Sequence, residues 1–196
     1  GSRNATIIDP FGHRWMLSGP MHGAGHHPAG IQHGDIGYVS LWTPDADRAA
    51  ALAARIEAEL GVTASTADSE AVAEADVVVT CTAATAPLFD GTLVPEHATV
   101  VAMGSHTTDA RETDDALARR ATVAVESRDS AAREAGDVTL AVASGALAGI
   151  EDTVTLAELV AGTARRREGA PALFVTTGMP WQDLVVASAV AREVLG

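Results

Sequence analysis

The chain has 196 residues, of which 47% are hydrophobic and 20% are charged, and its formal net charge is −13 at pH 7. This composition is typical of a globular protein with an ordinary hydrophobic core. The negative charge argues against nucleic acids and anionic membrane surfaces as partners, because both would repel the chain. All 13 basic residues are Arg, which excludes Schiff-base chemistry on a lysine.

Cys81 is the only cysteine, so no disulfide framework is expected and a cytoplasmic location is predicted. No apolar run approaches the roughly 20 residues that a membrane-spanning helix needs. We therefore expect a chain without a membrane segment.

The first 34 residues differ from the rest of the chain. The segment ATIIDPFGHRWML (5–17) contains two short apolar runs around a Pro-x-Gly turn, which predicts a β-hairpin. Residues 18–35 are rich in Gly, Pro and His and have no periodicity. We expect residues 1–34 to form an appendage of a hairpin and a loop, and residues 35–196 to form one α/β domain.

From Tyr38 onward, short β-branched runs alternate with Ala-rich amphipathic segments. The run YVSLW (38–42) predicts a strand, and Thr43 is a good N-cap for a helix that ends at Gly61. Further strands are predicted at 62–65, 76–81, 99–103, 122–126 and 172–177, and helices at 69–75, 113–120, 130–135, 156–161 and 180–195. Strands that are apolar on both faces and alternate with helices indicate a doubly wound, mostly parallel sheet covered by helices on both faces.

Five segments in chain order resemble the ornithine cyclodeaminase/mu-crystallin family. They are ADVVVTCTAATAPLFDG (75–91), VVAMGSHTTDARETDDAL (100–117), EAGDVTLA (134–141), LAELVAG (156–162) and LFVTTGMPWQDLVVASAV (173–190). The resemblance spans residues from about 38 to 196 and implies the Rossmann-like NAD(P)-binding domain of that family. It implies NAD(P)-linked oxidoreductase or cyclodeaminase chemistry, with Thr82, Gly104 and Ser105 at the nucleotide site.

Residues 4–50 also resemble a second family, the vicinal oxygen chelate family. ATIIDPFGHRWMLSGP is similar to the last strands of one of its modules, and HGDIGYVSLWTPDADRAA is similar to the first strand and helix of the next. The two resemblances together imply a chimera with its junction near residues 46–53. A chimera of this kind could fold and be catalytically silent.

The sequence departs from the cyclodeaminase pattern at the cofactor site. No GxGxxG or GxGxxA motif precedes Tyr38, and HGAGHHPAG (22–30) has its glycines at the wrong spacing. The glycine-rich turn is the usual clamp for a dinucleotide pyrophosphate. NAD(P) is therefore predicted to be an unlikely cofactor. His106 stands where some family members place a catalytic Asp.

Four of the seven histidines lie within twelve residues: His22, His26, His27 and His33. Neutral imidazole is a common ligand of zinc-like ions, so the four are candidate metal ligands. The alternative is a solvated, His-rich linker between two modules. If residues 13–17 ran parallel to the strand at 38–42, the His-rich segment at 18–35 would begin at the same edge of the sheet as Gly104.

The first functional hypothesis is therefore a divalent-metal-dependent hydrolase of low efficiency, with His106 as a catalytic base or further ligand. The alternatives are an NAD(P)-linked oxidoreductase of the cyclodeaminase type and the silent chimera. A small-molecule substrate and a homo-oligomer are expected in either active case. The acidic stretch from Asp109 to Asp115 is interpreted as a solvated helix entry.

Overall fold

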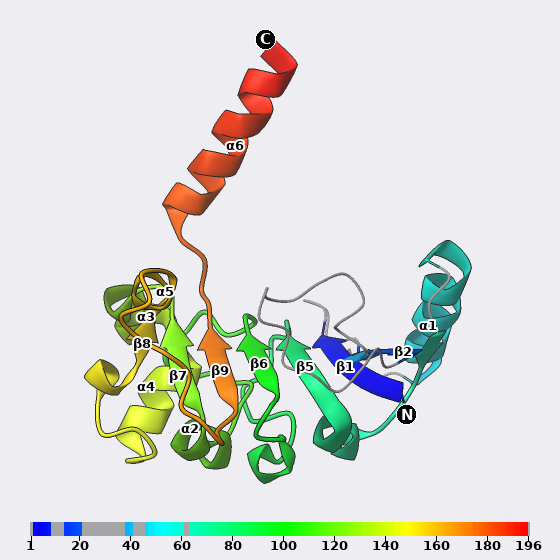
Figure 1. The fold of residues 1–196 in the computed structure, drawn as a ribbon, viewed down its shortest axis with the longest axis horizontal. Coiled ribbons are helices and arrows are strands. Elements are labelled where there is room, and N and C mark those ends of the chain that lie inside the picture. The colour runs from blue at the N-terminus through cyan, green and yellow to red at the C-terminus, as the bar shows by residue number, and fades with distance from the viewer. Residues whose placement is uncertain (1, 9–13, 21–37, 41–45, 61–62, 196) are drawn as a thin grey trace.

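A computed structural model describes residues 2–8, 14–20, 38–40, 46–60 and 63–195 (Figure 1). Within these ranges, nine strands form one sheet in the order β1-β2-β3-β5-β6-β9-β7-β8, and β4 pairs with β2 beside this path. The strands are β1 (Ser2–Ile8), β2 (Arg14–Pro20), β3 (Tyr38–Ser40), β4 (Thr63–Ser65), β5 (Ala75–Thr80), β6 (Thr99–Ala102), β7 (Thr122–Val125), β8 (Val154–Thr155) and β9 (Ala172–Val175).

The helices flank this sheet, with α1 beside β2 and β4 at one end and α2 to α5 gathered around β7 at the other (Figure 1). The α-helices are α1 (Ala46–Leu60), α2 (Asp115–Arg120), α3 (Arg128–Glu134), α4 (Gly136–Ala143), α5 (Leu156–Val160) and α6 (Pro180–Leu195). The 3-10 helices are η1 (Ser69–Glu74), η2 (Gly91–Leu93) and η3 (Ile150–Asp152). The predicted α/β fold with a mostly parallel sheet is confirmed.

The core lies where apolar strands meet the helices. All four residues of β7 are buried, and β6 and β9 alternate between partly and fully buried positions. The strands from β3 through β8 in the main sheet path pair in parallel, as in the register Val100↔Leu173. Strands buried on both faces are typical of a parallel sheet with helices on each side.

One helix was not expected from the sequence. The sequence predicts one helix at 130–135 that stops at Gly136, but in the structure α3 ends at Glu134 and α4 begins at Gly136. A Cβ atom at position 136 would overlap the carbonyl oxygen of Ala110, so glycine is required there by close packing. A glycine that permits a close approach and a glycine that stops a helix look the same in a sequence.

The predicted hairpin is present, but its second strand has the opposite direction to the one considered for residues 13–17. β1 pairs antiparallel with β2, and β2 pairs antiparallel with β3 through Leu17↔Val39. β1 itself runs parallel to β5. The parallel arrangement was therefore wrong, and the carboxyl end of β2 at Pro20 lies at the amino edge of β3 and β5.

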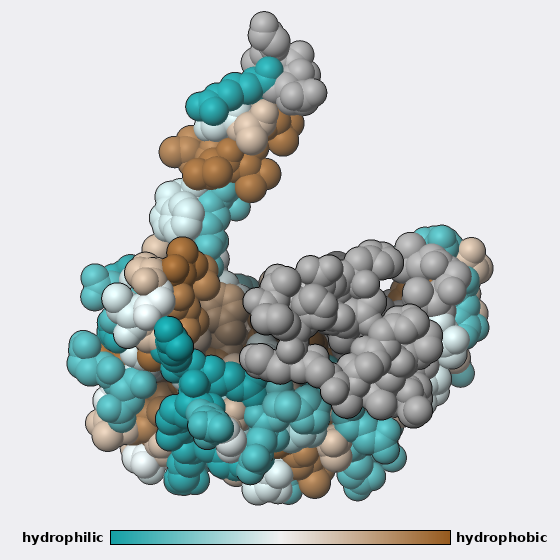
Figure 2. Space-filling view, in the orientation of Figure 1, coloured by the Kyte–Doolittle hydropathy of each residue, from teal (hydrophilic) through white to brown (hydrophobic). Residues whose placement is uncertain are grey.

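α6 projects from the rest of the molecule and carries exposed apolar side chains (Figures 1 and 2). They are Trp181, Leu184, Val185, Val186 and Val190, each at least 55% exposed. No helix in the described ranges is both long and apolar enough to cross a membrane.

Candidate functional site

Four neighbouring parallel strands, β5, β6, β9 and β7, end at the same edge of the sheet (Figure 1). Backbone hydrogen bonds continue past the strand ends, from the Met103 amide to the Thr80 carbonyl (2.9 Å) and from the Thr176 amide to the Ala102 carbonyl (3.0 Å). Doubly wound sheets bind their ligands at this carboxyl edge. The edge is therefore the candidate functional site.

A buried carboxylate from outside the sheet joins the ends of β5 and β6. Glu112 lies in the segment between β6 and α2, and it is 0% exposed. Its Oε1 accepts hydrogen bonds from the amide and the hydroxyl of Thr82 (2.6 and 2.7 Å), and its Oε2 accepts from the Thr80 hydroxyl (2.7 Å) and the Gly104 amide (2.8 Å). All four donors are neutral groups. The carboxylate is thus held by hydrogen bonds alone in the part of the chain described.

The backbone of Glu112 is held in turn by a second buried carboxylate. Oδ1 of Asp137, in the first turn of α4, accepts from the Glu112 amide (3.0 Å), the Thr113 amide (2.7 Å) and the Thr113 hydroxyl (2.6 Å). Its Oδ2 is buried without a hydrogen-bond partner among the described residues. Burial raises the pKa of the Asp137 carboxyl and the nearby Glu112 carboxylate adds to the rise, while the hydrogen bonds from Thr113 and from the Glu112 amide oppose it.

Gly104 makes the close approach of these groups possible. A Cβ atom at this position would overlap both the carbonyl oxygen and the amide nitrogen of Thr82 and would crowd Oε1 of Glu112. The turn after β6 can therefore lie against the loop after β5 only because residue 104 has no side chain.

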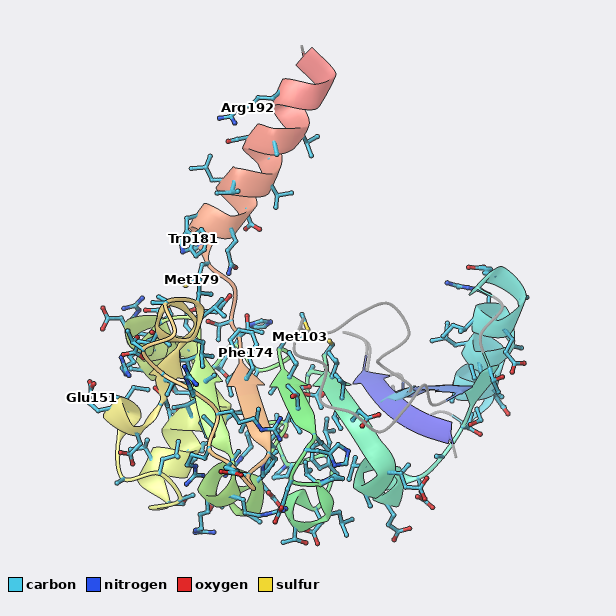
Figure 3. The ribbon with its side chains drawn as sticks, in the orientation of Figure 1. Met103, Glu151, Phe174, Met179, Trp181 and Arg192 are labelled. Atoms are coloured by element: carbon cyan, nitrogen blue, oxygen red, sulfur yellow. The ribbon has the colours of Figure 1, made fainter. Side chains whose placement is uncertain are left out.

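Three residues expected at a nucleotide site do come together here. Thr82 and Gly104 share Glu112, and Ser105 is 4% exposed on the same turn, with its hydroxyl donating to the Ala110 carbonyl at 2.5 Å. His106 follows on the same turn and is exposed. Met103, just before Gly104, is 42% exposed at this edge (Figure 3).

The four candidate metal ligands, His22, His26, His27 and His33, lie outside the described residues. Among the residues that are described, no group of three or more His, Cys, Asp or Glu side chains is placed to hold a metal ion.

Sequence reasoning missed the two buried carboxylates. The interpretation of residues 109–115 as a solvated helix entry is wrong for Glu112, which is fully buried. A usable signal existed, because Thr80, Thr82 and Gly104 place several donors at one sheet edge and a nearby acceptor is then needed. Asp137 had a similar signal, since it stands at a helix start between apolar residues.

Comparisons with known proteins agree with this architecture. The ornithine cyclodeaminase/mu-crystallin family matches residues 24–196. Ketimine reductase mu-crystallin of Mus musculus is 34% identical over 152 residues, which cover 78% of this chain and 46% of that protein. The chain thus spans about half the length of the curated relatives it matches.

Two solved structures are similar in fold. One is the Δ1-pyrroline-2-carboxylate reductase of Thermococcus litoralis in complex with NADH and L-proline, with a TM-score of 0.72 and 25% identity, covering 79% of this chain and 49% of that one. The other is an archaeal alanine dehydrogenase dimer with bound NAD, with a TM-score of 0.67 and 28% identity, covering 76% and 47%.

These matches correct two expectations. The hypothesis of a divalent-metal-dependent hydrolase is wrong, because the relatives are reductases. The expectation of a divalent metal in place of NAD(P) is wrong for the same reason, since the similar structures hold NADH or NAD. Closeness of four histidines in the sequence does not determine whether their side chains lie close enough in space to bind one metal ion. The five family segments in chain order indicate the cofactor class better than the absence of one glycine motif does.

A substitution at Gly104 tests the close approach. Gly104→Ala is expected to lower the free energy of unfolding by about 3 kcal/mol, because the added Cβ overlaps backbone atoms that cannot rotate away. Gly149→Ala is the matched control: its φ is −178° and no atom lies within 4 Å of the added Cβ, so a change within about 0.5 kcal/mol is expected. Urea unfolding measures both. Equal effects would contradict the geometry.

The raised pKa of Asp137 predicts a pH-dependent stability difference. The folded chain holds this proton more tightly than the unfolded chain, whose Asp pKa is about 3.9. The stabilisation is present in full below that value and is lost as the pH rises through the raised pKa. The unfolding free energy of the wild type, relative to that of Asp137→Asn, should therefore fall between pH 4 and the raised pKa and then level off.

Urea unfolding from pH 4 to pH 8 measures this difference. Asp109→Asn is the matched control, because it makes the same change of side chain at an exposed position. A wild type that gains stability relative to Asp137→Asn as the pH rises would contradict the burial of Asp137.

Proposed function

Since this chain belongs to the ornithine cyclodeaminase/mu-crystallin family, we propose that it binds NAD(P) and forms the dinucleotide-binding part of an NAD(P)-dependent reductase. The observation that carries this proposal is the similarity of the fold to a reductase solved with NADH and to a dehydrogenase solved with NAD. The substrate proposed is a small imine, because relatives are named ketimine reductase and Δ1-pyrroline-2-carboxylate reductase.

The residues of the carboxyl edge fit a dinucleotide in part. Ala83 and Thr85 after β5 and Met103 after β6 are among the exposed positions, and they lie near the amides of Thr82 and Gly104, which donate to Glu112. We place the dinucleotide against these exposed positions. When bound, the reduced dinucleotide would supply a hydride to the C=N carbon of the imine.

His106 is proposed as the group that gives a proton to the imine nitrogen. It is exposed on the turn that follows β6, and an imidazole can hold and release a proton near neutral pH. Thr82, Gly104 and Ser105 are proposed to shape the site, because their donors are engaged within the protein.

The origin of residues 4–50 remains a hypothesis. The family match begins at residue 24 and so includes much of the segment that resembles the vicinal oxygen chelate family. No comparison supports the chimera, and the catalytically silent form differs from our proposal in binding no dinucleotide.

Titration with NADH tests the proposed function. We expect saturable binding with a dissociation constant on the order of 0.1 mM. Met103→Glu should weaken binding by about tenfold, since it places a carboxylate at the edge where an anionic ligand sits.

Ala132→Glu is the matched control, because it adds the same charge at an exposed position of α3. Its affinity should stay within about twofold of the wild type. No saturable NADH binding by the wild type, measured by NADH fluorescence and by calorimetry, would reject the proposal.

We also propose that the chain forms a homo-oligomer through α6, whose apolar residues are exposed on several sides. An archaeal relative is a dimer. Light scattering should give a mass that is a multiple of 20.0 kDa, and Val185→Glu should shift it towards one chain. Val160→Glu, on α5 and 83% exposed, should leave the mass unchanged. A wild type of 20.0 kDa would exclude the oligomer.

A further inference from the structure

We infer that Glu112 and Asp137 form a relay of two buried carboxylates that positions the carboxyl edge of the sheet for its ligand. The two residues are 0% and 1% exposed, so neither can contact a bound dinucleotide directly. Both act through other groups and are positioning residues. Their role for the ligand rests on the proposed dinucleotide site, but the contacts that define the relay do not.

The first link of the relay is the Glu112 carboxylate. It accepts from the amides of Thr82 and Gly104, which belong to the loops after two neighbouring strands. Backbone amides at a sheet edge commonly bind the phosphates of a nucleotide. Here an internal anion already occupies them, so a ligand must use the residues on either side, such as Ala83 and Met103. The positions of those residues follow from the bonds to Glu112.

The second link is the carboxylate of Asp137. It accepts from two consecutive amides, those of Glu112 and Thr113, and from the Thr113 hydroxyl. These bonds fix the backbone from which the Glu112 side chain extends. Asp137 lies in the first turn of α4, so the position of that helix determines where the Glu112 carboxylate lies.

The segment between the end of β6 and Glu112 is held by internal hydrogen bonds and by close packing against α4. The Ser105 hydroxyl donates to the Ala110 carbonyl (2.5 Å), and Gly136 packs so tightly on the same carbonyl that no Cβ would fit. The Glu112 carbonyl accepts from the Leu88 amide at 2.9 Å. A displacement at α4 therefore cannot be absorbed by the loop and reaches the ends of β5 and β6.

A purely stabilising role would give the same contacts, so the experiment must separate position from stability. Glu112→Gln preserves the side-chain volume but replaces one of the two acceptor oxygens with an NH₂ group, which cannot accept hydrogen bonds from the donors that face it. Val94→Ala removes volume at a buried position that precedes β6, at the opposite edge. The two variants are compared with the wild type at temperatures equally far below each midpoint of unfolding. The readouts are hydrogen exchange of the Thr82 and Gly104 amides and the NADH dissociation constant.

We expect Glu112→Gln to speed exchange at both amides by about tenfold or more and to weaken NADH binding by a similar factor. Val94→Ala should leave both quantities within about twofold of the wild type. Asp137→Ala should also speed exchange at Gly104, which Asp137 does not contact, because it removes the three hydrogen bonds that hold the backbone of Glu112 and Thr113. Equal behaviour of Glu112→Gln and Val94→Ala would overturn the inference.

Two further results remain informative. If Glu112→Gln does not fold, Thr80→Val removes one donor at constant shape, and unchanged exchange at Gly104 in that variant would overturn the relay. If the wild type binds no NADH, the proposed function fails, whereas the exchange comparison still decides whether the two carboxylates position the edge.

Discussion

The arrangement of the carboxyl edge depends on one buried carboxylate. Moving an ionised carboxyl group out of water costs several kcal/mol, and Glu112 has four neutral donors to offset that cost. A hydrogen bond to a charged group contributes about 1.5–3 kcal/mol, so the loss of any one of the four donors is expected to be destabilising. This requirement explains why hydroxyl side chains end β5 and why residue 104 has no side chain.

The same requirement reaches into the helical layer. Glu112 can hold the strand ends only if its own backbone is fixed, and Asp137 at the start of α4 provides that fixing. α4 can come close enough only because residue 136 is glycine. Two glycines far apart in the sequence, Gly104 and Gly136, thus serve one buried polar network rather than two separate turns.

The fold could be predicted because the pattern of apolar residues along the chain indicates which segments form buried strands and which form helices. The strands around Val78, Val100 and Leu173 are continuous apolar runs, and each is followed by a helix. Glu112 could not be predicted in the same way, because three of its four donors belong to Thr80 and Thr82 at the end of β5, 32 and 30 residues earlier in the chain. The direction of β2 in the sheet could not be predicted, because a short apolar run fits a strand that is parallel or antiparallel to its neighbours. The functional error came from ranking a histidine cluster above an ordered series of weaker family segments.

The base of α6 is fixed by this same edge. Glu126, just after β7, accepts from the amides of Thr177 (3.2 Å) and Gly178 (2.9 Å) and from the side chain of Gln182 (2.7 Å). Gly178 has a φ of +79°, which a residue with a side chain rarely adopts. The helix therefore leaves the carboxyl edge in a defined direction, with apolar side chains on several sides. A partner that covers the first turns of α6 must then lie next to the strand ends, so assembly and ligand binding involve adjacent parts of the molecule.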